Sequence, residues 1–287
     1  MRNGPIRQSF SVSGATFSRF LLNLQSDSYI ITLNFSYWRE CGVSQVVSVI
    51  SGKGGTGKTS LCAGISSCLA AEGSQVLCID ADVGLRNLDL SLGMSEEPIL
   101  PFTAVMRGEY SLDSAAAHPE IPNLYMLTAP VTETAEELDA AQFSAMLDAA
   151  RQRFDWILID APAGIGAGFR LATGSADQAI VVAGSDPASL RDAARATDVL
   201  LQQRSIPARL VVNRVSAALY RRMHATIDDV MDGVGLPLLG IVPEDSSVTL
   251  AAAAGTALAL YTGKGAARAC LNIARRLCGR KMPLLRF

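Results

Sequence analysis

The stretch Ser51-Gly-Lys-Gly-Gly-Thr-Gly-Lys-Thr59 decides the fold of this chain of 287 residues. From Gly52 through Gly57-Lys58-Thr59 it fits the loop pattern that cradles nucleotide phosphates, because glycines let the backbone bend tightly and turn its N–H groups toward an anion. We expect Lys58 to reach the β- and γ-phosphates and the Thr59 hydroxyl to bind Mg²⁺. The other loop residues expected to contact the nucleotide are Lys53, Gly54, Gly55, Thr56, Gly57 and Ser60.

The residues around this loop supply the structural context that the motif requires. Residues 45–50 form a β-branched run of strand length, and apolar side chains recur at helical spacing between residues 61 and 71. The phosphates would therefore meet the positive end of a helix dipole as well as the N–H groups of the loop. The alternative is a glycine-rich turn with surface lysines, which the agreement between motif and context disfavours.

Composition is that of an enzyme-sized domain. With 49% hydrophobic and 18% charged residues, the chain can bury one large core, although its length would also permit two domains. A formal net charge of −2 argues against a protein whose whole surface binds DNA, although a local basic patch could still do so. The six cysteines include no Cys-x-x-Cys pair, so we expect them to be reduced and cytosolic, with Cys62, Cys68 and Cys78 on buried faces. His118 and His224 are the only histidines, which argues against a zinc site or a Ser-His-Asp triad.

Buried apolar runs alternate with helical stretches along the rest of the chain. Gly73 is expected to end the first helix, and further strands are predicted at residues 75–80, 124–127, 156–160, 178–183, 209–213 and 238–242. Helices between parallel strands cover both faces of a sheet, so the pattern predicts a doubly wound, mainly parallel α/β domain. Ligands of such sheets bind beyond the C-terminal ends of the strands.

Three aspartates follow two of these predicted strands. Asp80 and Asp82 come after the second strand, and Asp160 ends the run Trp156-Ile-Leu-Ile159. Carboxylates at this edge of the sheet suit the metal shell, so Asp80 and Asp160 are candidate Mg²⁺ residues together with Thr59. Asp82 is placed to orient the attacking water. The alternative is that these aspartates cap helices or turns.

Residues 1–44 do not fit this domain. They are rich in serine and aromatic residues, contain no acidic residue before Asp27, and lack an apolar stretch of membrane-spanning length or a clear signal peptide. We expect a disordered or spurious extension, with an organellar transit peptide as the alternative. Residues 45–287 are then a single P-loop ATPase domain.

The loop, with its additional Lys53, resembles the deviant Walker A motif of the ParA/MinD family of ATPases. The run Asp80-Ala-Asp-Val-Gly-Leu-Arg-Asn-Leu-Asp-Leu90 resembles, within that family, the branch that places the division septum. The similarity covers residue 45 to the C-terminus. Further matches lie at residues 160–165, 168–169, 190–192, 211–214 and 240–245.

The resemblance implies a role for each matching residue. In the family, the lysine at the place of Lys53 reaches the nucleotide of a second copy, so that ATP joins a sandwich homodimer which hydrolysis dissolves. Lys53, Lys58 and Asp82 would be the catalytic residues, with Asp82 positioning water and residues 160–168 forming a switch. The walls around adenine would be Asn213, Arg214, Pro243, Glu244 and Asp245.

The resemblance also implies partners and a location. Division-inhibitor and topology-factor proteins of the MinC and MinE type are expected, with a cytoplasmic protein that reversibly contacts the inner face of the cell membrane. Two features depart from the family pattern. The chain stops at Phe287, near where a linker to an amphipathic membrane helix would begin, so only a weak anionic contact is expected from Arg275, Arg276, Leu277, Arg280, Lys281, Leu284, Leu285, Arg286 and Phe287. Gly166 stands where an acidic residue is common.

Two other interpretations stay open on the sequence. A ParA-like or flagellar-number ATPase would share the loop and act in partitioning or in positioning an assembly. A non-hydrolysing Fe–S scaffold would need a cysteine pair at the dimer face, and no such pair is evident in the sequence.

Overall fold

The computed structural model describes residues 10–12, 15–17, 43–216 and 226–284. Residues 1–33 form a unit separate from residues 34–287, and in it β1 (Phe10–Val12) pairs antiparallel with β2 (Ala15–Phe17). The remainder of residues 1–42 lies outside the described residues. The assignment of residues 1–44 to a disordered or spurious extension therefore stays a prediction.

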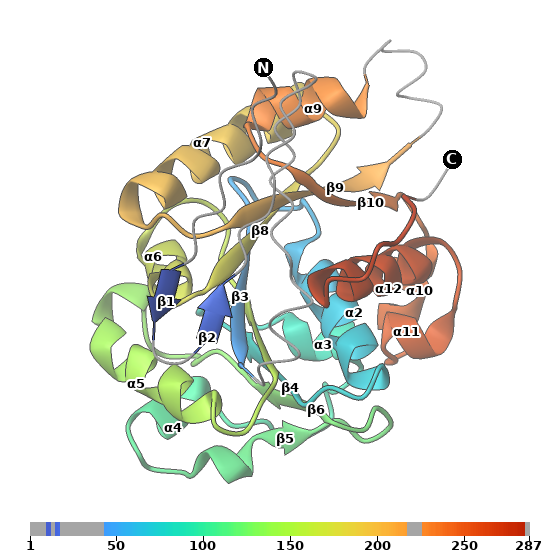
Figure 1. Ribbon diagram of the computed structural model, residues 1–287. Helices are drawn as coiled ribbons and strands as arrows, with labels where there is room; N and C mark the ends of the chain where they lie inside the picture. The colour runs from blue at the N-terminus through green and yellow to red at the C-terminus, as the bar shows by residue number, and fades with distance from the viewer. Residues whose placement is uncertain (1–9, 13–14, 18–42, 217–225, 285–287) are drawn as a thin grey trace. The chain divides into compact units, whose positions relative to one another are not determined.

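The larger unit is built on one sheet of eight strands in the order β10-β9-β8-β3-β7-β4-β6-β5 (Figure 1). Every pairing is parallel except that between β5 and β6. The predicted doubly wound, mainly parallel sheet is therefore confirmed. The strands are β3 (Gln45–Ile50), β4 (Val76–Asp80), β5 (Ala116–Ala117), β6 (Leu124–Leu127), β7 (Trp156–Asp160), β8 (Gln178–Ala183), β9 (Ala208–Val215) and β10 (Leu238–Pro243).

Helices cover both faces of the sheet and bury a separate apolar core on each (Figure 1). One face carries α2 (Lys58–Ala71), α3 (Leu88–Leu92), α10 (Ser247–Ala253), α11 (Leu258–Tyr261) and α12 (Gly265–Leu277). The other carries α4 (Phe102–Met106), α5 (Ala140–Ala150), α6 (Ala167–Gly174), α7 (Pro187–Gln203) and α9 (Ile227–Val234). Short 3₁₀ turns, η1 (Leu112–Ser114) and η2 (Ala135–Glu137), lie in the connections.

The strands read as continuous apolar runs because both of their faces are covered. All residues of β3, β4, β7 and β8 are buried. The three cysteines predicted to be buried, Cys62, Cys68 and Cys78, are buried with free thiols. Since buried parallel strands are largely hydrophobic, sequence patterning located them well.

The boundaries differ from expectation at a few helix starts and at one edge strand. Helix α2 begins at Lys58, directly after the loop, rather than near residue 61. Helix α7 begins at Pro187 after its N-cap Asp186, before the matching run at residues 190–192. The edge strand β5 was not predicted, because two alanines carry no β-branched or alternating signal.

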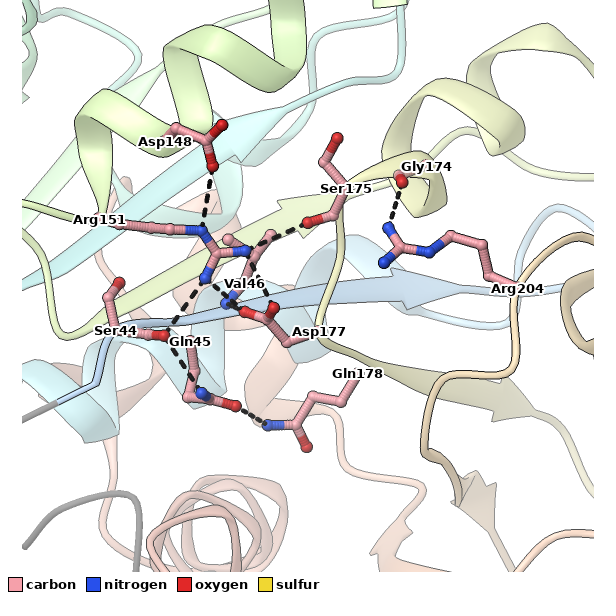
Figure 2. Close-up of polar contacts among 10 residues, drawn as sticks. All are labelled: Ser44, Gln45, Val46, Asp148, Arg151, Gly174, Ser175, Asp177, Gln178 and Arg204. Atoms are coloured by element: carbon pink, nitrogen blue, oxygen red, sulfur yellow. Dashed lines mark hydrogen bonds and ion pairs between the residues drawn. The ribbon is translucent and has the colours of Figure 1, made fainter. Parts of the chain in front are cut away.

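A cluster of polar contacts around Arg151 and Asp177, called here the polar clasp, lies where β3 and β8 begin, at the end of the sheet opposite the glycine loop (Figure 2). Arg151, which follows α5, donates to Asp177 Oδ2 and Oδ1 at 2.6 and 3.0 Å. It also donates to the carbonyl oxygens of Ser44 and Ser175, each at 3.3 Å. Asp177 Oδ2 accepts the N–H of Val46 at 2.7 Å. The clasp ties the starts of β3 and β8 to the end of α5.

We expect Arg151→Ala to lower the free energy of unfolding by about 2–3 kcal/mol, because it leaves the half-buried Asp177 carboxylate without its bidentate partner. Arg204→Ala is the control, since Arg204 is exposed and gives a single hydrogen bond to Gly174 O in the same region (Figure 2). It should cost less than about 1 kcal/mol. Urea unfolding of both variants checks this, and equal losses would contradict the clasp.

Candidate nucleotide-binding site

The glycine loop leaves the C-terminal end of β3 and enters α2 through a left-handed residue. Gly57, the N-cap of α2, has φ 86°, a conformation that glycine adopts without strain. A Cβ at Gly57 would lie 2.3 Å from Asn213 Nδ2. Asn213, from β9, donates this Nδ2 to Thr56 O at 2.8 Å. The loop is therefore pinned to β9, and only glycine fits at its exit.

The start of the loop packs against α7. A Cβ at Gly52 would lie 2.0 Å from the carbonyl oxygen of Asp192, so a side chain there would force the loop away from the helix. Lys53 Nζ lies 3.0 Å from Asp186 Oδ1, with about a third of the lysine side chain exposed. Asp186 also caps α7 by accepting the Ser189 N–H at 2.9 Å. Gly54 and Gly55 are exposed beside Lys53.

The predicted carboxylates meet at the ends of adjacent strands. Asp80 of β4 and Asp160 of β7 are direct register partners, which places their backbones about 4.8 Å apart in the sheet. Burial raises the pKa of Asp160 to about 7, the Thr59 side chain as hydrogen-bond partner lowers it, and Asp80 raises it. Burial likewise raises the pKa of Asp82, and Lys58 opposes that shift. Lys58 itself is buried.

Asp160 and Thr59 fit a Mg²⁺ site. Asp160 is 1% exposed, and its Oδ1 has no hydrogen-bond partner in the structure. A buried carboxylate oxygen left without a partner is costly, and a hard cation that takes oxygen ligands would satisfy it. The Thr59 side chain adjoins the same carboxylate. The predicted pair therefore lies where a metal bound to the phosphates of the loop would sit.

A cleft of about 360 Å³ opens beside the loop, between β9 and the turn from β10 into α10. Its size and its mixture of apolar and polar walls suit a small organic ring system. The structure brings the predicted adenine contacts together here, with two residues of the phosphate loop region. These residues are Gly57, Ser60, Asn213, Arg214, Pro243, Glu244 and Asp245.

Both acidic residues that line this cleft are engaged within the chain. Asp245 Oδ1 accepts the Ser247 N–H at 2.9 Å, and its Oδ2 accepts the Ala266 N–H at the same distance. These backbone donors lower the pKa of Asp245. Glu244 pairs with Arg214 at 2.9 Å, and Arg214 has a left-handed backbone with φ 57°. Asp245 therefore shapes the cleft by joining the starts of α10 and α12.

Sequence reasoning did not identify the apolar lining of the cleft. The floor includes Leu61 of α2, which was assigned only to a helix face, and residues of the C-terminal helices. Those residues follow no polar motif, and their approach to the loop depends on the packing of α12 against α2. They are Val248 of α10, Leu258 of α11, and Ala266 and Cys270 of α12, while Val242 of β10 and Thr249 of α10 also line the cleft.

Gly166, where the family pattern has an acidic residue, is the N-cap of α6. A Cβ there would meet no atom within 4 Å. A Cβ would therefore fit at this position without displacing the chain.

The C-terminal basic residues mostly make contacts within the chain. Glu72 accepts Arg275 at 2.8 Å and Arg280 at 2.6 Å. Arg276 donates to Met282 O at 2.8 Å and to Leu239 O at 2.6 Å, and Leu277 is buried. Of the predicted tail contacts, Arg280, Lys281 and Leu284 are exposed, while Leu285, Arg286 and Phe287 lie outside the described residues. No described helix reaches the length and hydropathy that a bilayer crossing requires.

A parallel sheet with a glycine loop at the end of a central strand, a buried lysine and strand-end carboxylates defines a P-loop nucleotide-binding protein. The family model of the CobQ/CobB/MinD/ParA nucleotide binding domain matches residues 47–258, and the chain belongs to this family.

Within the family, the similarity is to septum site-determining MinD proteins. The chain is 35% identical to MinD of Synechocystis sp. over 248 residues, which cover 85% of this chain and 93% of the relative. It is 35% identical to MinD of Bacillus subtilis over 246 residues, with coverage of 84% and 92%.

Solved structures agree with this placement. A MinC:MinD cell division protein complex from Aquifex aeolicus aligns with a TM-score of 0.78 at 32% identity, covering 85% of this chain and 99% of that chain. MinD from Pyrococcus horikoshii, complexed with Mg-ADP, aligns with a TM-score of 0.71 at 27% identity, covering 82% and 96%. The recognition of the MinD branch from the loop and from the run at residues 80–90 is confirmed.

The raised pKa of Asp160 predicts a pH effect on stability without nucleotide or Mg²⁺. The folded state keeps the Asp160 proton up to about pH 7, whereas the unfolded chain loses it near the ordinary pKa of 3.8. Stability from this group therefore falls as pH rises through that window. Relative to wild type, we expect Asp160→Asn to raise Tm more at pH 8 than at pH 5.

Thermal unfolding at the two pH values measures this difference. Asp198→Asn, at an exposed position of α7, is the control and should show the same difference at both pH values. A Tm of Asp160→Asn that falls below wild type at pH 8 would contradict the assignment.

Proposed function

We propose that this chain is a MinD-type ATPase that dimerises on Mg-ATP and acts as a spatial switch in placing the division septum. Hydrolysis to ADP and phosphate returns the dimer to monomers. The observation that carries this proposal is Lys53, a second lysine held at the edge of the phosphate loop beside the exposed Gly54 and Gly55. A lysine there can leave its own subunit, which the buried Lys58 cannot do.

The contact that holds Lys53 is weak enough to be exchanged. Lys53 and Asp186 form an ion pair with side chains 37% and 54% exposed, and such pairs contribute about 0.2–1 kcal/mol. A triphosphate brought up by a second copy offers several negative charges to the same ammonium group. The Lys53 ammonium group of one copy would then stabilise the charge that develops on the γ-phosphoryl group bound to the other copy. A monomer lacks this contact.

The other side chains divide the hydrolytic work. The loop N–H groups and Lys58 bind the β- and γ-phosphates, and Thr59 and Asp160 hold Mg²⁺, which when bound neutralises developing phosphate charge. Burial raises the pKa of Asp82, and Lys58 lies close enough to oppose that shift. Asp82 orients the attacking water. The cleft formed with Asn213 and Pro243 receives the adenine ring. The Mg-ADP complex of Pyrococcus horikoshii MinD supports Mg²⁺ and nucleotide as ligands.

The partners follow from the family. The MinC:MinD complex from Aquifex aeolicus supports a division inhibitor of the MinC type as a partner of this chain. We propose a topology factor of the MinE type as the activator of hydrolysis. The protein would be cytoplasmic and would bind the inner face of the membrane reversibly as a dimer.

Two variants separate binding from chemistry. Lys58→Ala removes the buried cation of the phosphate site, so we expect it to abolish both ATP turnover and ATP-induced dimerisation. Asp82→Ala leaves the phosphate contacts intact, so we expect it to bind ATP and to accumulate as a long-lived dimer with little turnover. Phosphate release and analytical ultracentrifugation measure the two properties.

The two variants have different failure outcomes. Near-normal turnover in Lys58→Ala would contradict the phosphate-loop assignment. An Asp82→Ala protein that binds ATP but stays monomeric would contradict the proposed role of Asp82. Wild-type protein that sediments as a monomer with saturating Mg-ATP would overturn the switch itself.

Membrane binding should be weak and should need ATP. A basic residue near anionic lipid contributes about 1 kcal/mol. From the predicted set, the described tail exposes Lys281, Leu284 and Arg280, and Arg280 is paired with Glu72. A dimer presents two tails, so the second contact forms at high effective concentration. Removing residues 280–287 should abolish ATP-dependent sedimentation with vesicles that contain phosphatidylglycerol.

The matched control is Leu201→Ser, another exposed leucine, on α7. It should leave vesicle binding unchanged. Tight binding without ATP would contradict the avidity argument, and unchanged binding after the deletion would assign the contact to another part of the chain.

A further inference from the structure

The carboxylate of Asp80, the last residue of β4, accepts hydrogen bonds from backbone N–H groups of the segment that follows it. It is fully buried, and its Oδ1 accepts the Asp82 N–H at 3.0 Å. Its Oδ2 accepts the N–H groups of Asn87 and Leu88, each at 3.1 Å. One side chain therefore holds both ends of the segment 82–88.

The middle of this segment has a defined shape as well. Arg86 has a left-handed backbone with φ 39°, which is unfavourable for a residue with a side chain. Its Nε donates to Thr128 Oγ1 at 2.9 Å, and Thr128 is itself bonded to the backbone at residue 100. A strained residue persists where its surroundings over-determine it. The segment is thus fixed at its two ends and at its centre.

Asp80 differs from its neighbour Asp160 in this respect. An ionised carboxylate offers about four acceptor sites, and three of those on Asp80 receive backbone N–H groups. Asp160 keeps an oxygen with no partner. A metal ligand needs a free oxygen. Of the two register partners, Asp160 is therefore suited to bind a metal ion, whereas Asp80 is suited to hold the backbone by hydrogen bonds.

We propose that Asp80 is a positioning residue, which fixes the backbone that carries Asp82 beside the phosphate site. This assignment rests on the proposed ATPase function for the role of Asp82. It replaces the expectation that Asp80 belongs to the Mg²⁺ shell. Because Asn87 and Leu88 start α3, the same carboxylate makes Asp82 and α3 move together.

Asp80→Asn keeps the size of the side chain but exchanges one acceptor oxygen for a donor NH₂ group. That group would face a backbone N–H, so at least one end of the segment is released. A displacement of about 1 Å at a positioning group can cost about 100-fold in rate. ATP turnover should therefore fall by about that factor, while the affinity for ATP and the Mg²⁺ concentration that half-saturates binding change by less than about threefold.

Hydrogen exchange of the amides supplies a readout that does not depend on activity. In wild-type protein without nucleotide or Mg²⁺, the amides of Asn87 and Leu88 should be protected, although N–H groups at a helix start ordinarily have no partner. In Asp80→Asn they should exchange at least about tenfold faster. Asp160→Asn is the matched control, and it should shift the Mg²⁺ requirement without changing this exchange.

Three results would overturn the assignment. These are unprotected Asn87 and Leu88 amides in the wild type, unchanged exchange in Asp80→Asn, and a Mg²⁺ requirement that rises about tenfold in that variant as in Asp160→Asn. The wild-type measurement stands even if Asp80→Asn fails to fold. If the wild type does not hydrolyse ATP, the proposed function fails, whereas the exchange data still decide whether Asp80 holds the segment.

Discussion

The position of β3 is the constraint on which the site depends. It is hydrogen-bonded to β7 on one side and to β8 on the other. The glycine loop at its C-terminal end therefore lies between the ends of two buried strands. Parallel pairing sends the C-terminal ends of all these strands to one edge. Asp160, the cap of α7 and Asn213 of β9 therefore converge on the loop from separate parts of the chain. The clasp around Arg151 closes the other end of β3 and holds that strand in register.

Two adjacent carboxylates at this edge have opposite environments. Asp80 accepts three backbone N–H groups, whereas one carboxylate oxygen of Asp160 has no hydrogen-bond partner. Burial raises the pKa of both groups, but backbone N–H groups partly offset the effect at Asp80. A carboxylate whose oxygens accept hydrogen bonds from its own chain stabilises a conformation. A carboxylate with an oxygen that lacks a hydrogen-bond partner can bind a cation. Residues that look equivalent along the sequence can thus divide between positioning and binding.

The lysines of the loop divide in a similar way. Lys58 is buried within its own subunit, and Lys53 lies at the edge on an exposed ion pair. This contrast supports the proposed nucleotide switch that is shared between two copies. The C-terminal arginines show the reverse case, in which charges that look free in the sequence are held by Glu72 and by carbonyl oxygens.

The sequence by itself determined the parallel strands, the loop and the family, because buried parallel strands are largely apolar and phosphate binding requires glycines at fixed spacing. It also placed Asp80, Asp82 and Asp160 at strand ends. It did not determine the apolar floor of the cleft, where Cys270 and Leu258 approach the loop only because α12 and α11 pack against α2. Nor did it distinguish Asp80 from Asp160 or reveal that Arg275 and Arg280 are paired. Those outcomes depend on which backbone and side-chain groups arrive from distant segments, and only the tertiary structure decides that.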